Sequence, residues 1–330
     1  MTRPTRAWVL LAALAALALA RAPTWAAGDA EAPRLHDVLQ VTGNLGYRSA
    51  TFSLKGDELA FVRARAGGGL YRMSLENPVP VLALPGVGPE EPWRFGAEGL
   101  ALEAAPRTWG ERWWLSVDPS GATAMKRGED QPIWRGVRIR DHQLEVFTRG
   151  AFTRWDLPRD HWRDPSVSDD ARWIAVVGAE AGLVVVDTWG GALRYLGPAG
   201  RGSFSPGGNW LVFDRVPDGS APAGAGNASE PLGEAADLVA YDVAADRATT
   251  LTSTPARAER RPEIAPDGKR LVFDADGAIF LGSLDLPRRG SEPRPSEVTV
   301  PRVPVPKPPR PPVPPRAPVP RRAPDGVRAP

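Results

Sequence analysis

The sequence predicts an all-β protein: a six-bladed β-propeller of four-stranded blades, followed by a disordered proline-rich tail at the C-terminus. One observation is a repeated phrase in which a short polar turn separates two apolar strand sequences. A second is the spacing of that phrase, roughly 40 residues, which is the length of one propeller blade. A third is that no segment shows sustained helical periodicity.

The clearest copy of the repeat occupies residues 263–273 and reads Glu-Ile-Ala-Pro-Asp-Gly-Lys-Arg-Leu-Val-Phe. Proline sets φ at the first corner of the turn, aspartate can bond to nearby backbone, and glycine accepts a positive φ. Residues 204–213 repeat the pattern closely, and looser copies begin at Phe52 and Val167. Each turn therefore predicts a strand–turn–strand unit.

Six copies can be followed along the chain, and the second and third are degenerate. Their starting residues are Phe52, Phe95, Val137, Val167, Phe204 and Ile264. The steps between them are 43, 42, 30, 37 and 60 residues, and the last becomes 40 without the 20-residue insertion 217–236, which is rich in Gly, Ala, Ser and Pro. In the third copy, strands are evident at 137–139, 143–147 and 152–157, but no fourth strand is.

The first strand of the propeller has an outer-strand sequence. Residues 39–42 (Leu-Gln-Val-Thr) precede the first repeat much as residues 249–252 precede the last. We therefore expect the first strand to complete the last blade and close the ring, which removes open sheet edges. Residues 297–300 are then an exit strand or a competitor for the same place.

Composition divides the chain into four segments: a signal peptide at 1–26, a linker at 27–37, the propeller at 38–300 and a basic tail at 301–330. The first has two early arginines, an apolar run over 7–20 and small residues before position 27, as in a secretory signal. The alternative is an uncleaved anchor. The 330 residues include no cysteine, so a lipid anchor on cysteine is excluded. We expect a periplasmic or secreted protein.

The net charge of +2 is unevenly distributed. Residues 27–300 carry 38 acidic and 31 basic residues, a net charge of about −7, whereas the tail carries seven basic residues and one acidic residue. The propeller is therefore not expected to bind nucleic acid. The tail, with 13 prolines, favours polyproline II. It could contact an anionic envelope polymer or lipid, or have no partner.

The repeats at 204–213 and 264–273 resemble those of TolB-type (WD40-like) propellers, in which a Ser-Pro-Asp-Gly turn precedes an apolar strand. Val239–Val243 and the pair Leu251–Thr252 occupy the positions of the following strand and of the closing Leu-Thr. The resemblance covers roughly residues 38–286. It does not include the α/β domain that precedes the propeller in TolB. It implies a six-bladed periplasmic propeller of the envelope. Similar repeats occur in the propellers of prolyl-oligopeptidase-type peptidases. Those peptidases also need a hydrolase domain, and the propeller leaves too few residues in this sequence for one.

No catalytic, cofactor-binding or metal-binding residues are predicted, so the sequence predicts that the chain is not an enzyme. Residues 200–204 lack the closing glycine of a Gly-x-Ser-x-Gly elbow. Repeated aspartates such as Asp170 and Asp267 fall in turns, where backbone bonding explains them. His142 and His161 share an Arg-Asp-His phrase, but two histidines without a third ligand make a weak metal site.

Tryptophan is concentrated in the two degenerate copies and provides the candidate partner-binding residues. These are Trp109, Trp113, Trp114, Trp134, Trp155 and Trp162. Consecutive tryptophans in a strand face opposite sides of the sheet, so at least one is a candidate for exposure. The sequence therefore predicts a monomeric, non-catalytic scaffold for an envelope protein. The alternatives are a glycan-binding or carbohydrate-active propeller with a channel-mouth site, or a propeller that only presents its tail.

Overall fold

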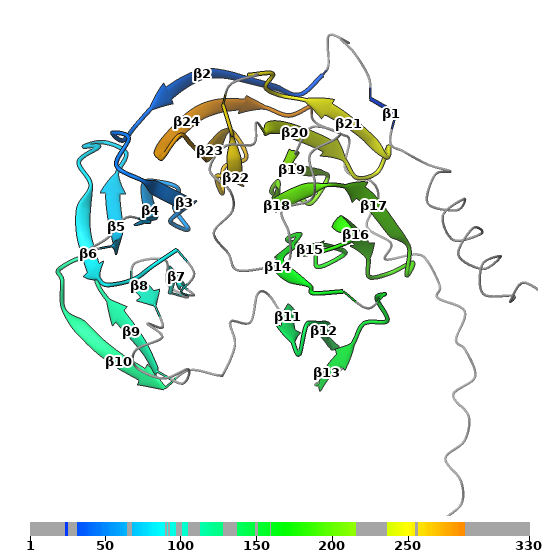
Figure 1. Ribbon diagram of the computed structural model, residues 1–330, viewed down its shortest axis with the longest axis horizontal. Coiled ribbons are helices and arrows are strands. Elements are labelled where there is room, and N and C mark those ends of the chain that lie inside the picture. Colours follow the sequence, from blue (N-terminus) through cyan, green and yellow to red (C-terminus); the bar gives the residue numbers. More distant parts are fainter. Residues whose placement is uncertain are drawn as a thin grey trace, which may run out of the picture. The chain divides into compact units, whose positions relative to one another are not determined.

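The described residues form a ring of six β-sheets, as Figure 1 shows. The computed structural model describes residues 24–25, 32–64, 68–89, 91, 93–96, 101–104, 113–127, 137–148, 151–158, 160–215, 236–254 and 257–287. All of them belong to the compact unit Met1–Arg288, which the contact pattern separates from Arg289–Pro330. The predicted exit strand at 297–300, the tail and most of the insertion 217–236 lie outside the described residues.

The six sheets are six blades, which confirms the predicted propeller. Blade 1 contains β3 (Tyr47–Phe52), β4 (Glu58–Arg63), β5 (Gly69–Ser74) and β6 (Val81–Pro85). Blade 2 contains β7 (Trp93–Phe95), β8 (Leu102–Ala104), β9 (Trp113–Val117) and β10 (Thr123–Arg127). Blade 3 contains β11 (Val137–Arg140), β12 (Gln143–Thr148) and β13 (Ala151–Arg154).

The remaining blades follow the cleaner repeats. Blade 4 contains β14 (Arg163–Val167), β15 (Trp173–Gly178), β16 (Gly182–Asp187) and β17 (Leu193–Gly197). Blade 5 contains β18 (Ala199–Phe204), β19 (Trp210–Arg215), β20 (Asp237–Asp242) and β21 (Arg247–Thr250), with β1 (Thr24–Trp25) added in parallel. Blade 6 contains β22 (Arg260–Ile264), β23 (Arg270–Ala275), β24 (Ala278–Asp285) and β2 (Arg34–Gln40). No helix among the described residues is long and apolar enough to cross a membrane.

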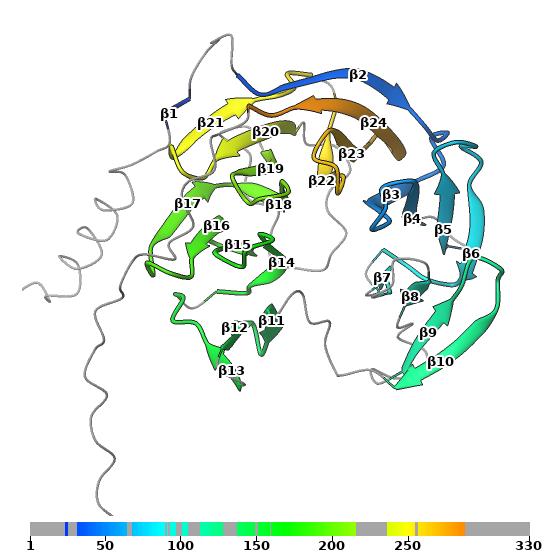
Figure 2. The ribbon, with the colours of Figure 1, turned by 180° about the vertical axis from the view of Figure 1, so that it is seen from behind.

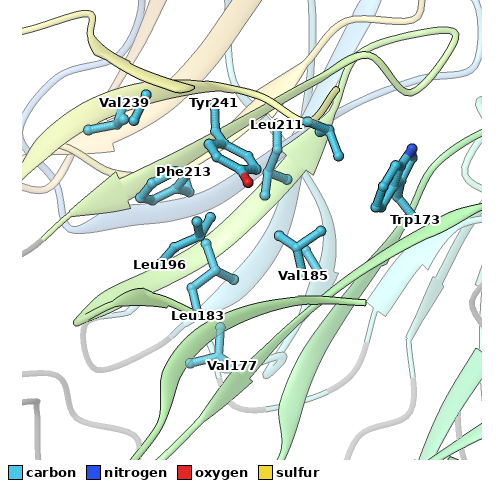
Figure 3. Packing of buried hydrophobic residues seen from close by; sticks show 12 residues of the cluster. Trp173, Val177, Leu183, Val185, Leu196, Leu211, Phe213, Val239 and Tyr241 are labelled. Carbon is cyan, nitrogen blue, oxygen red and sulfur yellow. The ribbon is translucent and has the colours of Figure 1, made fainter. Parts of the chain in front are cut away.

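The second and third strands of the clean blades are buried on both faces because a blade on each side covers them. In blade 4, β15 and β16 are almost continuously apolar and buried. One face of blade 4 packs against blade 5, and Figure 3 shows Leu183 and Val185 facing Phe213 and Leu211 across this contact. The packing between blades therefore supplies the hydrophobic core.

The first strand closes the ring, as predicted. β2 pairs antiparallel with β24, with Arg34 opposite Asp285 and Gln40 opposite Phe280. Figure 1 shows β2 in blue along β24 in orange, and Figure 2 shows the same pairing from behind. The N–H of Val41 also donates to the Ile279 carbonyl at 2.9 Å. The last blade is thus held together by the two ends of the propeller sequence.

The closing pair includes an exposed histidine whose charge we expect to depend on its neighbours. His36 contacts Asp37 through Nδ1 at 2.8 Å and Asp285 through Nε2 at 3.1 Å. The Asp37 hydrogen bond, followed by contributions from Asp285, raises the pKa of His36 above its usual value. The contribution of these His36 contacts to folding stability is therefore present at low pH and decreases as the pH rises through the raised pKa.

In an NMR titration, Asp37→Asn is expected to lower the His36 pKa, and Asp285→Asn to lower it less. An unchanged His36 titration in Asp37→Asn would contradict this assignment.

Blade 3 has three described strands. The sequence indicated that the fourth strand is missing, whereas the structure indicates that it is the first. Arg140 and Gln143 pair across a two-residue turn, Asp141 (φ 50°) and His142 (φ 58°). A turn of the same length and with positive φ at both residues joins the second and third strands of blade 6 through Asp276 and Gly277. β11 is therefore a second strand, and the innermost strand of blade 3 has no counterpart in the described residues. This explains why the step from Val137 to Val167 is only 30 residues. Val137 begins a second strand, whereas the other starting residues of the repeat lie at or near the ends of innermost strands.

Adjacent blades share an apolar cluster at five of the six junctions, as judged from the residues the structure describes. No such cluster of described residues joins blades 2 and 3, and each of these two blades has a charged pair between its own strands. Arg94 Nε lies 3.0 Å from Glu103 Oε2 in blade 2, and Arg138 Nε lies 2.7 Å from Glu145 Oε2 in blade 3. Blade 3 also leaves the Phe147 side chain half exposed. The degenerate repeats thus coincide with the least apolar junction of the ring.

Candidate functional site

The tryptophans singled out in the sequence do not form one described surface. Trp109 and Trp134 lie outside the described residues. Trp113 and Trp114 are consecutive in β9, opposite Arg127 and Lys126, and their side chains are not described. Trp155 is partly buried against the cluster between blades 3 and 4.

Trp162 is a core residue. Its side chain is only 1% exposed, and its indole N–H donates to the Pro158 carbonyl at 3.0 Å. It packs in the same cluster as Val137 and Ile174, so it cannot serve as a contact for a partner without unfolding the blade. The excess of tryptophan in this region therefore partly reflects packing.

An exposed tryptophan that the sequence did not single out lies in the β16–β17 turn. Trp189 is 55% exposed, the highest value for any described tryptophan with a described side chain. Its backbone N–H donates to Asp187 Oδ1 at 3.0 Å. The neighbouring Thr188 hydroxyl lies 2.9 Å from the Ala171 carbonyl and 3.0 Å from that of Arg172. The turn that presents Trp189 is thus bonded to the β14–β15 turn beside it.

Trp189 is the outer member of a stack that we call the tryptophan–arginine ladder, made of Trp189, Arg172, Trp173 and Arg194. The guanidinium of Arg172 lies between the two indoles, 5.1 Å from the Trp189 ring centroid and 4.7 Å from that of Trp173. Arg194 covers Trp173 at 5.1 Å. Each cation–π contact contributes about 0.5–2 kcal/mol, depending on its exposure. The ladder therefore packs the Arg172 guanidinium against an exposed indole.

The inner end of the ladder is anchored in the neighbouring blade. Arg194 Nη1 donates to the Tyr241 hydroxyl at 3.2 Å and to the Val243 carbonyl, and the Tyr241 hydroxyl donates to Asp246. Burial raises the pKa of Tyr241, and the Asp246 hydrogen bond raises it further, so the hydroxyl stays a donor at neutral pH. Figure 3 shows Tyr241 in the apolar cluster and Trp173 at the edge of that cluster. The ladder thus connects the surface of blade 4 to the core between blades 4 and 5.

The ladder lies at the end of the ring that we call the turn face. This end carries the turns between first and second strands and those between third and fourth strands, such as 168–173 and 187–192 in blade 4. The sequence signal for Trp189 was weak because it is a single tryptophan in a clean repeat. A large aromatic followed by two glycines in a turn was nevertheless a detectable sign of exposure, because a turn offers little room to bury it.

A second group of polar side chains lies on the innermost strands of three blades. Glu263 of β22 accepts a hydrogen bond from the Thr51 hydroxyl at 2.8 Å and lies 3.3 Å from Arg201 Nη2. These three residues come from blades 6, 1 and 5. Arginine and glutamate here are partly exposed. Together they form a carboxylate–arginine–hydroxyl group, which is able to bind polar ligands.

Two further carboxylates join successive blades near the same strands. Asp274 accepts from the Ser49 N–H at 3.1 Å and from Arg261 Nη1 at 3.1 Å, which links blade 6 to blade 1. Asp214 accepts from the Arg261 N–H at 3.2 Å and links blade 5 to blade 6. Both side chains are buried. They occupy the same position of the repeat, which indicates a structural role at the junctions.

The turn aspartates also bond to their own turns. Asp267 Oδ1 accepts from the Lys269 N–H at 2.9 Å, and its Oδ2 accepts from Arg270 at 2.7 Å. Burial raises the pKa of Asp267, but these hydrogen bonds outweigh burial and hold the pKa below its usual value. Among the residues that the structure describes, no three His, Asp or Glu side chains gather as a metal-binding group.

Comparisons with known proteins identify the fold but no family. No protein-family profile matches the sequence, and no curated protein matches it. The chain is similar in structure to a gluconolactonase from Xanthomonas campestris, with 12% identity, a TM-score of 0.51, and coverage of 76% of this chain and 91% of that one. A putative TolB from Agrobacterium tumefaciens has 16% identity and a TM-score of 0.47, with coverage of 73% and 91%. An oligogalacturonate lyase in complex with manganese has 14% identity and a TM-score of 0.43, with coverage of 77% and 96%.

One prediction from the sequence is corrected and another is confirmed. The prediction that the chain is not an enzyme is contradicted, because the similar structures include the gluconolactonase, an enzyme built on a similar propeller. The lack of a recognisable motif therefore does not argue against catalysis. The TolB-like propeller is confirmed at the level of the fold, since the described residues form a ring of six sheets. The chain is a six-bladed propeller, a fold that it shares with the gluconolactonase.

Proposed function

We propose that this protein is an exported propeller that binds a protein partner in the cell envelope through its turn face, with Trp189 as the central contact. The observation that carries the proposal is the tryptophan–arginine ladder, which packs the Arg172 guanidinium against an exposed indole. Tryptophan and arginine are the residues most enriched at the energetic centres of protein interfaces. A side chain ordered before binding also loses less entropy when the complex forms.

The leader at residues 1–26 supports export, and the absence of cysteine from the sequence supports a protein without a cysteine-linked lipid. We infer a monomer, which light scattering on the purified protein can test. The basic tail 301–330 is proposed as an additional contact to an anionic envelope polymer or lipid. Its contribution can be separated from that of the turn face because the two are far apart in the sequence.

Affinity capture from envelope extract tests the proposal with four baits: the full chain, the chain ending at residue 300, Trp189→Ala and Tyr195→Ala. Tyr195 is a matched control because it is another half-exposed aromatic of blade 4. We expect one protein to be retained by the full chain, the shortened chain and Tyr195→Ala, and lost by Trp189→Ala. Loss with the shortened chain alone would instead assign binding to the tail. Retention by Trp189→Ala would refute the turn-face site.

A second candidate is recognition or processing of carbohydrate at the channel mouth. The contacts of Glu263 with Thr51 and Arg201 favour it, because carboxylate, guanidinium and hydroxyl groups all bond to sugar hydroxyls. Binding of envelope oligosaccharides that is lost in Glu263→Gln but kept in Trp189→Ala would support this candidate over a protein partner.

A further inference from the structure

Two of the three histidines of the chain lie against each other at the end of the ring opposite the turn face. The ring centroids of His142 and His161 are 4.5 Å apart, with an angle of 71° between the planes. His142 belongs to the β11–β12 turn of blade 3, and His161 precedes β14 of blade 4. Both residues are exposed. The contact thus brings two accessible imidazoles from different blades together.

The backbone fixes both histidines. His142 has φ 58° at a position where the matching turn of blade 6 has Gly277 with φ 77°. A two-residue hairpin turn of this kind requires positive φ at both positions, and glycine meets that requirement at lower cost than histidine. The peptide before His161 is held by Asp160, which accepts N–H groups from His161 at 2.6 Å and Ala181 at 2.9 Å. His142, which its turn holds at positive φ, therefore faces His161, whose backbone N–H is bonded to Asp160.

We propose that His142 and His161 form a two-ligand site for a divalent transition-metal ion of the zinc type, which links blades 3 and 4. Neutral imidazole is a preferred ligand of Zn²⁺, Ni²⁺ and Cu²⁺. With metal–nitrogen bonds of 2.0–2.1 Å and an angle of about 90–110° at the metal, two ligating rings have centres roughly 4.5–5 Å apart. The observed separation of 4.5 Å lies at the lower end of this range, and the rings would turn from their edge-to-face contact so that one nitrogen of each faces the ion. Water molecules complete the coordination.

The surroundings are compatible with such an ion. Asp141 precedes His142 in the turn and is exposed, and its carboxylate is 3.8 Å from Arg154 Nη2. Asp160 is fully occupied by backbone N–H groups, so it orients His161 and is not counted as a ligand. The site also adjoins blade 3, which shares no apolar cluster with blade 2 among the residues that the structure describes. A metal link to blade 4 would add support there.

Zinc titration of the purified, untagged, chelator-treated protein tests the site. The sequence has no cysteine and only three histidines, so the background is low. We expect one equivalent of Zn²⁺ to bind and to raise the melting temperature. His142→Asn and His161→Asn should each weaken binding at least tenfold. His36→Asn, which removes the remaining histidine, should leave binding unchanged.

A glycine variant separates the turn from the site. His142→Gly should raise the melting temperature of the metal-free protein, because glycine suits φ 58°, and should abolish the rise caused by Zn²⁺. Failure of the unmodified protein to bind Zn²⁺ would overturn the proposal. Binding by His142→Asn or His161→Asn that is as tight as binding by the unmodified protein would overturn it as well, as would a zinc-induced rise retained in His142→Gly.

Discussion

Asp274→Ala is expected to lower the free energy of unfolding by about 3–5 kcal/mol, because it removes one member of a buried charged pair. The Asp274 carboxylate receives the N–H of Ser49 in blade 1 and the guanidinium of Arg261 in blade 6. Both donors would lose this acceptor at the junction that closes the ring. Chemical denaturation followed by tryptophan fluorescence provides the measurement.

Two variants show whether this loss belongs to the junction. Asp276→Asn changes an exposed carboxylate two residues further along, at φ 53°, where asparagine is tolerated, so it should change stability by less than about 0.5 kcal/mol. Asp214→Ala should be destabilising like Asp274→Ala, because it breaks the corresponding link between blades 5 and 6. If Asp274→Ala were as stable as Asp276→Asn, the proposed role of Asp274 in ring closure would be wrong.

Trp189→Ala is expected to weaken binding of the captured partner by about 2 kcal/mol or more, roughly 30-fold in Kd. The indole is the most exposed part of the tryptophan–arginine ladder, and its truncation leaves Arg172 without the outer aromatic surface. Binding of the purified partner can be measured by calorimetry. Trp189→Phe should lose less affinity, because it keeps an aromatic face beside Arg172.

The same variant should have little effect on folding, since Trp189 is more than half exposed. The melting temperature is therefore expected to stay close to that of the unmodified protein, which excludes unfolding as the cause of lost binding. Tyr195→Ala should keep the affinity of the original chain. An equal loss in Tyr195→Ala and Trp189→Ala would mean that the contact surface extends across blade 4 and is not centred on Trp189.

The blades with clean repeats could be predicted because their signals are local. Pro-Asp-Gly at 266–268 determines its own turn, and the apolar strand after it must be buried between blades. Ring closure by β2 was also predictable, since an outer-strand sequence stood before the first repeat with no inner strands of its own. Blade 3 was misread because a two-residue turn containing Asp141 and His142 resembles no Asp-Gly or Pro-Asp-Gly turn in sequence.

The candidate site was less predictable than the fold. The abundance of tryptophan in the degenerate blades indicated a surface, yet Trp162 is buried there. The exposure of Trp189 could not be predicted, because the exposure of a side chain in a turn depends on what the neighbouring turn covers. Abundance of an apolar side chain therefore indicates hydrophobic area, which can be packed inside or displayed outside.

The sequence by itself determined the six repeats, the turns that join their strands and the strand that closes the ring, because each follows from local turn chemistry and alternation of apolar residues. Only the tertiary structure decided which residues meet across blades. Arg194 of blade 4 bonds to Tyr241 of blade 5, and His142 of blade 3 meets His161 before β14 of blade 4, because the ring brings these strands and turns together. Such contacts depend on the register of neighbouring strands and blades, which no local pattern in the sequence specifies.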